Sequence, residues 1–103
     1  MATLAFILNA PIPASMSTLY TATNSVELAS SISLCNTYGI DIDVYLMFVP
    51  SGGVGRTGAI VYGKTMAGHS QLTLDERYMR TGYTIRGLAN VGNAVQLVSN
   101  ITR

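Results

Sequence analysis

Apolar and polar residues alternate along most of the chain after residue 18. The segments 26–35 and 42–49 are typical, because every second side chain in each is mainly apolar. Successive side chains of a β-strand point to opposite faces, so this alternation predicts strands with one buried face. Applied to the whole chain, the pattern predicts strands at residues 19–22, 26–35, 42–49, 59–65, 71–74, 83–89 and 94–102.

Turn-forming residues separate these segments. The separators read NTYG, PSGGVGRTG, AGHS, RTG and NVGN, and Gly, Asn, Asp, Ser and Pro favour turns. The stretch LDERYMR at 74–80 has a helical charge pattern but is too short for a helix, so we expect a single turn or a bent strand. We predict an all-β fold, an antiparallel β-sandwich of about seven strands, jelly-roll or Ig-like, over residues 18–103.

The N-terminal residues 1–17 differ from the rest. They carry no charged side chain, and Pro11 and Pro13 flank Ile12. Proline fixes its own φ and restricts the preceding residue, which excludes a helix there and favours extended backbone. We expect an extended N-terminal arm that lies either on its own domain or on a neighbouring subunit.

Charge is scarce. The net charge is +1, charged residues make up 11% of the chain and hydrophobic residues 49%, whereas ordinary soluble domains have roughly 25% charged residues. No apolar run approaches the ~18 residues that would cross a bilayer, so we expect no membrane partner. The composition favours permanent contact with other subunits. The alternative is a monomer with a surface rich in Ser, Thr and Asn.

The stretch VPSGGVGRTG at 49–58 resembles the phosphate-binding loop of protein tyrosine phosphatases. In that loop a cysteine nucleophile lies six residues before the arginine, but six residues before Arg56 stands Pro50. A helix must also follow the loop to hold the anion, whereas the β-branched run AIVYGKT predicts a strand. The Walker phosphate loop fails as well, because its first glycine would fall on Pro50. We therefore expect a hairpin loop without catalysis, in which Arg56 contacts a neighbouring subunit.

Other candidate chemistry is sparse. Asp41 and Asp43 would share one face of a strand, but two carboxylates are few for calcium, which takes 6–8 oxygen ligands. His69 is the single histidine and Cys35 the single cysteine, so neither a closed zinc site nor an intramolecular disulfide is expected. We predict no enzyme activity, catalytic residue, metal, cofactor or small-molecule substrate.

One cluster combines basic and aromatic residues, around Arg77 to Arg86. Such clusters can bind single-stranded nucleic acid, but Asp75 and Glu76 dilute the charge and we do not expect it to bind nucleic acid. Arg and Tyr are also enriched at protein interfaces. Together with the arm and the glycine-rich loop, this gives the candidate interface residues Leu4, Phe6, Ile7, Ile12, Arg56, Arg77, Tyr78, Arg80, Tyr83 and Arg86.

Several short motifs occur in an order that resembles small β-sandwich accessory virion proteins of tailed bacteriophages. They are LYTA at 19–22, LCN at 34–36, VYLMFVPSGG at 44–53 and LTLD at 72–75. The resemblance implies a capsid decoration or cement protein on the capsid exterior of the virion, with the major capsid protein and copies of itself as partners. The resemblance also allows a neck, tail or fibre component of the virion. A rival of a different class is a host-surface or carbohydrate-binding module built on exposed tyrosines.

Overall fold

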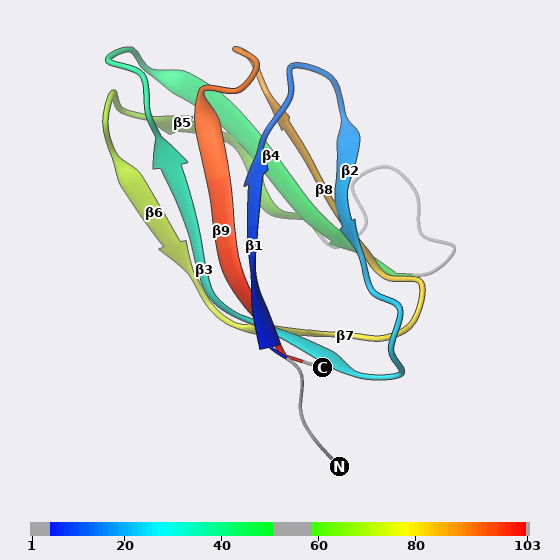
Figure 1. The fold of residues 1–103 in the computed structure, drawn as a ribbon. Coiled ribbons are helices and arrows are strands. Elements are labelled where there is room, and N and C mark those ends of the chain that lie inside the picture. The colour runs from blue at the N-terminus through cyan, green and yellow to red at the C-terminus, as the bar shows by residue number, and fades with distance from the viewer. Residues whose placement is uncertain (1–4, 51–58, 103) are drawn as a thin grey trace.

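The computed structural model describes residues 5–50 and 59–102, and they form two packed antiparallel sheets (Figure 1). The predicted all-β antiparallel sandwich is confirmed. The strands are β1 (Ala5–Pro11), β2 (Ser17–Thr21), β3 (Glu27–Asn36), β4 (Ile42–Val49), β5 (Ala59–Met66), β6 (Gln71–Leu74), β7 (Arg77–Met79), β8 (Thr84–Ala89) and β9 (Val95–Thr102).

Sheet A contains β1, β9, β3 and β6 in that order, and β7 also pairs with β3. Sheet B contains β2, β8, β4 and β5 in that order. The long strand β3 pairs with β9 along one side and with β6 and β7 along the other. Strands β1, β2, β5 and the pair β6 and β7 are therefore the sheet edges.

The described residues form nine strands where the sequence pattern predicted about seven. One addition is β7, in the stretch expected to be a turn or bent strand. The other is β1, which lies within the N-terminal arm. It pairs with β9 over seven residues, from Ala5 opposite Thr102 to Pro11 opposite Gln96. Residues 5–11 thus lie on their own domain.

The core fills the space between the two sheets, as the period-two pattern requires. Alternate residues of β3, β4, β8 and β9 point inward and are fully buried, including Ile32, Val44, Ile85 and Leu97. Ile12, between the two prolines of the arm, is also fully buried. Its backbone exchanges hydrogen bonds with the β8–β9 connection and β9: its N–H donates to Val95 and its carbonyl accepts from Asn93.

Three polar side chains are buried among the described residues, Glu27, Asn36 and Ser99, and each has a hydrogen-bond partner. The Glu27 carboxylate accepts hydrogen bonds from the Tyr20 hydroxyl and from the backbone N–H groups of Thr23 and Asn24 at 2.7 and 2.8 Å. A buried carboxylate is costly unless it is well bonded, and these bonds fasten the β2–β3 connection onto the start of β3.

Asn36, at the end of β3, is the second. Its side-chain amide donates to the carbonyls of Ile40, Met66 and Ala67, and its side-chain oxygen accepts from the Tyr38 N–H. Four bonds satisfy a buried amide group that would otherwise be unfavourable in the core. Asn36 thus holds the β3–β4 and β5–β6 connections together.

An irregularity interrupts β3 near its middle. Ser31 has a φ of 50°, and the β3–β9 register shifts between Ser30 and Ser33. A β-bulge of this kind disturbs the ladder locally. The buried Ser99 hydroxyl donates a 3.0 Å hydrogen bond to the carbonyl of Ser30 beside the bulge.

Candidate subunit interface

The sheet edges differ in how they are protected against pairing with another chain. Natural proteins protect edges with lysine, with bulges, or by keeping the strand short. Strand β5 carries Lys64 and two register shifts against β4. Strand β2 spans five residues and has a register shift, while β6 and β7 span four and three residues. Each of these edges therefore has at least one protective feature.

Strand β1 has none of these features over most of its length. It is seven residues long, it carries no charged residue, and its register against β9 is unbroken. Pro11 stands only at its last position. Ile7, next to its central residue, is 69% exposed. A long, regular, uncharged edge strand offers a row of backbone N–H and C=O groups for pairing with another strand.

The outer face of sheet A is the second feature. The side chains that point outward from it form rows across the strands: Ala5, Thr102, Leu28 and Tyr78; Ile7, Asn100 and Ser30; Asn9, Val98, Ser33 and Thr73; and Pro11, Gln96, Cys35 and Gln71. None of these described strand residues is charged. The outer face of sheet B differs, because Asp43 and Arg86 point outward there on β4 and β8.

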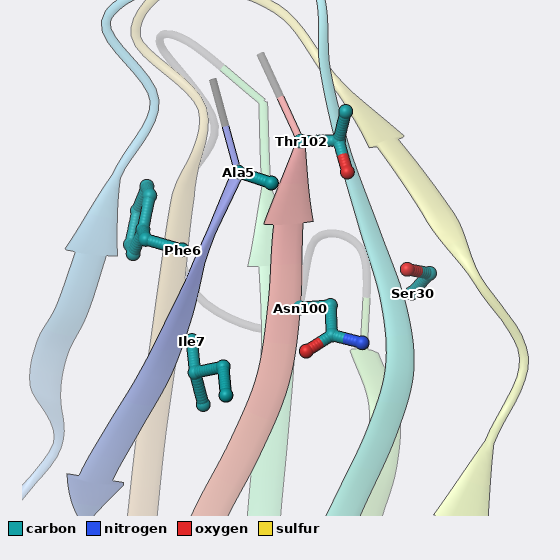
Figure 2. A pocket seen from close by; sticks show the side chains of 6 residues that line it. All are labelled: Ala5, Phe6, Ile7, Ser30, Asn100 and Thr102. Carbon is teal, nitrogen blue, oxygen red and sulfur yellow. The ribbon is translucent and has the colours of Figure 1, made fainter. Parts of the chain in front are cut away.

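A hollow of about 350 Å³ lies on the outer face of sheet A, beside the β1 edge. Figure 2 shows the six residues that line it: Ala5, Phe6, Ile7, Ser30, Asn100 and Thr102. They come from β1, β9 and β3, and the bulge at Ser31 lies next to the hollow. The lining offers hydroxyl, amide and aliphatic groups but no ionisable group, which suits contact with a neutral protein surface better than catalysis or anion binding.

The arm residues of the predicted interface separate into two kinds. Ile7 is exposed on the outer face, whereas Phe6 points inward and packs its ring against Tyr20, with 5.7 Å between ring centroids. Ile12 is fully buried, so its side chain belongs to the core and cannot contact another subunit. Leu4 lies outside the described residues.

The predicted basic-aromatic cluster is divided between the two sheets. Arg77 and Tyr78 are exposed on β7 of sheet A, and Arg80 is exposed just after it. Tyr83 packs against the core, and Arg86 points outward from β8 in sheet B. The Arg86 Nε is buried and has no hydrogen-bond partner among the described residues. These residues do not form one continuous surface.

The glycine-rich loop at 51–58, with Arg56, also lies outside the described residues. Its flanking strands are described: β4 and β5 pair antiparallel, and β5 begins at Ala59 where a phosphate-binding loop would require a helix. The strand predicted after the loop is therefore confirmed.

The candidate metal and catalytic residues have structural roles or stand apart. Asp43 accepts a 2.6 Å hydrogen bond from the Thr65 hydroxyl, and its backbone N–H donates to the Asn90 side chain. His69 has a φ of 57° in a turn, where its N–H donates to the Tyr38 carbonyl. Among the described residues, no group of three His, Cys, Asp or Glu side chains gathers to hold a metal. Nor does that part of the chain hold a helix able to span a membrane.

The sequence pattern missed some structurally important residues. Glu27 was expected only as a member of a strand and Asn36 only as the first residue of a turn, yet they are the buried polar centres of two connections. Asn36 ends the LCN motif, and an asparagine at the end of an alternating strand was the available signal. For Glu27, the signal was a lone carboxylate among apolar residues just after a turn.

Comparison with known proteins shows the fold and little else. No family model matches the chain, and no curated protein matches it. A solved structure, described by the words "Bacillus endospore appendages form a novel family of disulfide-linked pili", has a similar fold, with a TM-score of 0.56 and 16% sequence identity. The match covers 98% of this chain and 85% of that one.

This comparison corrects the functional expectation. The bacteriophage capsid decoration or cement role is wrong, because the structural match is a bacterial spore appendage and no phage protein is matched. The same finding removes the neck, tail and fibre alternative. Among the tyrosines whose exposure the structure describes, Tyr38 and Tyr78 are exposed, and they are badly placed for one carbohydrate-binding face. Tyr78 pairs near the start of β3, whereas Tyr38 follows its end.

Proposed function

We propose that this protein is a structural subunit that assembles with copies of itself, and that the β1 edge is its principal contact. The observation that carries the proposal is the unprotected state of β1: seven regular, uncharged residues, with Ile7 exposed next to the central residue. The other described edges have lysine, register shifts or short strands.

The partner strand is most simply β1 of a second copy. Pairing β1 antiparallel with itself places the same residues on both sides of a two-fold axis, which closes the contact as a dimer. Pairing β1 with β5 of another copy would bring Lys64 into the new ladder. The low charge of the chain supports permanent self-contact, since obligate interfaces are depleted in charge. The similarity in fold to a subunit of pili is consistent with an assembling role.

The test is the mass of the protein in solution, measured by light scattering after size-exclusion chromatography. Replacing Ile7 with lysine puts a charge near the centre of the edge, as natural edge strands do. We expect the wild-type protein to be oligomeric and Ile7→Lys to be monomeric. Thr81→Lys adds the same charge in an exposed turn after β7 and should leave the mass unchanged. A monomeric wild-type protein, or an Ile7→Lys variant with the wild-type mass, would refute the proposal.

A further inference from the structure

We infer that the outer face of sheet A is a second self-association site, through which two β1-paired dimers stack face to face into a tetramer. This inference rests on the proposed β1 pairing. Its independent observation is the chemistry of the face: the residues that the strand registers place outward on β1, β9, β3, β6 and β7 are uncharged. The exposed Arg77 of β7 pairs with the buried Ala29 and so does not belong to this set.

The symmetry of the edge contact makes the face continuous. When two antiparallel strands pair in one sheet, the two-fold axis that relates them is perpendicular to the sheet. Both copies then turn the outer face of sheet A to the same side. The uncharged rows, such as Ile7, Asn100 and Ser30, continue across the joined edge into the second copy.

The joined face has the size of a stable interface. Four strands at about 4.8 Å spacing and seven residues at about 3.3 Å cover on the order of 450 Å² per copy. Two stacked copies would bury about 900 Å², which is below the ~1,200 Å² of the smaller stable interfaces. Two stacked dimers would bury about 1,800 Å², within the standard range of roughly 1,600 ± 400 Å². The stack is therefore expected between dimers and not between monomers.

The proposed occupant of the face is another copy of this chain, because an uncharged face can pack against an identical uncharged face. In a self-stacked face each residue meets another member of the same set, so a charge on the face would lose its water without meeting an opposite charge. A face of Ser, Thr, Asn, Gln, Val and Ile avoids this cost. The outer face of sheet B, with Asp43 and Arg86, lacks this property.

Lysine substitutions at the centre of the face separate the two contacts. Ser33 and Val98 are paired neighbours on β3 and β9, and both are half-buried on the outer face. Strand β9 stands between β3 and the β1 edge, so Ser33→Lys leaves the edge free to pair. We expect the wild-type protein to have four times the mass of one chain. Ser33→Lys and Val98→Lys should each have twice the mass of one chain, and Ile7→Lys should have the mass of a single chain. Thr81→Lys should keep the fourfold mass.

Cys35 supplies a second readout without substitution, since it points outward on the same face. Its labelling by a maleimide reagent should slow at least tenfold when the protein is concentrated from dimer to tetramer. A wild-type dimer, a polymer larger than four chains, or a Ser33→Lys variant of unchanged mass would overturn the stacking inference. A wild-type dimer that Ile7→Lys converts to a monomer would still uphold the β1 edge.

Discussion

The side-chain amide of Asn36 donates a hydrogen bond to the carbonyl of Met66 at 3.1 Å, and this bond joins the two sheets. Asn36 ends β3 in sheet A, whereas Met66 ends β5 in sheet B. The same amide also bonds the carbonyls of Ile40 and Ala67. One buried side chain thus fixes how two connections meet at this end of the sandwich.

Replacing Asn36 is expected to destabilise the fold strongly. Asn36→Ala removes the donor to the three carbonyls and the acceptor of the Tyr38 N–H, at about 3 kcal/mol in the free energy of unfolding. The Ala67 carbonyl keeps another partner, the Ser70 N–H. Asn36→Asp should be at least as harmful, because a carboxylate would face three carbonyl oxygens. Urea unfolding measures both variants. Asn24→Ala, at an exposed position whose backbone alone bonds Glu27, should change stability by less than about 0.5 kcal/mol. Equal stability of Asn36→Asp and wild type would contradict this role.

The Glu27 carboxylate gives a second stability prediction. It accepts hydrogen bonds from Tyr20, Thr23 and Asn24. Glu27→Gln replaces one acceptor oxygen with a donor NH₂ group that must face other donors, at an expected cost of about 2–4 kcal/mol. Glu76→Gln is the matched control, because Glu76 is exposed between β6 and β7. Thermal unfolding of both variants decides the matter, and similar melting temperatures would show that the buried carboxylate is dispensable.

Gly68 is expected to tolerate no side chain. A Cβ atom at Gly68 would lie 2.5 Å from the carbonyl carbon of Gly39. That carbon belongs to the backbone, so no side-chain rotation can relieve the clash. A Cβ atom at Gly39 would meet only the His69 ring, at 3.3 Å. We expect Gly68→Ala to destabilise the protein by about 2 kcal/mol or more, and Gly39→Ala by less than about 1 kcal/mol. Chemical denaturation of the two variants gives the comparison, and the reverse order would contradict the close approach of these loops.

The single cysteine predicts how the assembly responds to reductant. One thiol per chain can link two chains and no more, so a continuous disulfide-linked polymer cannot be built from this chain's cysteine alone. The proposed contacts are backbone pairing and neutral side chains, which need no disulfide. We expect Cys35→Ser, and wild type with dithiothreitol, to keep the wild-type mass in light scattering. Dissociation by reductant would mean that a Cys35 disulfide holds the subunits together.

The sequence pattern predicted the fold class well and the interface only in part. Alternation predicted the long strands because their inward residues, such as Leu34 and Leu97, are fully buried. It missed β1 as a strand of the sandwich, because two prolines and the absence of charge indicated an arm without saying where the arm would lie. The position of the arm is decided by the pairing of β1 with β9, which lies about ninety residues later in the chain. Such distant pairing leaves no local signal in the sequence.

The candidate site shows the same limit. Ile7 could be chosen from the sequence as an apolar residue in an uncharged segment, but Ile12 in the same segment proved to be core. The uncharged face of sheet A is made from five separate strands of the chain. Residues such as Ser33, Val98 and Thr73 become neighbours only through the strand registers, so composition could indicate a neutral surface but not its position.

The most direct test of the central claim is hydrogen–deuterium exchange of the β1 amides at different protein concentrations. An edge strand of a monomer leaves the outward half of its amides open to water, whereas pairing with a second copy protects them. We predict that protection of residues 5–11 rises with concentration, while β5 in sheet B exchanges at a constant rate, and that Ile7→Lys abolishes the rise. Exchange of β1 that is independent of concentration in an oligomeric wild-type protein would contradict the account.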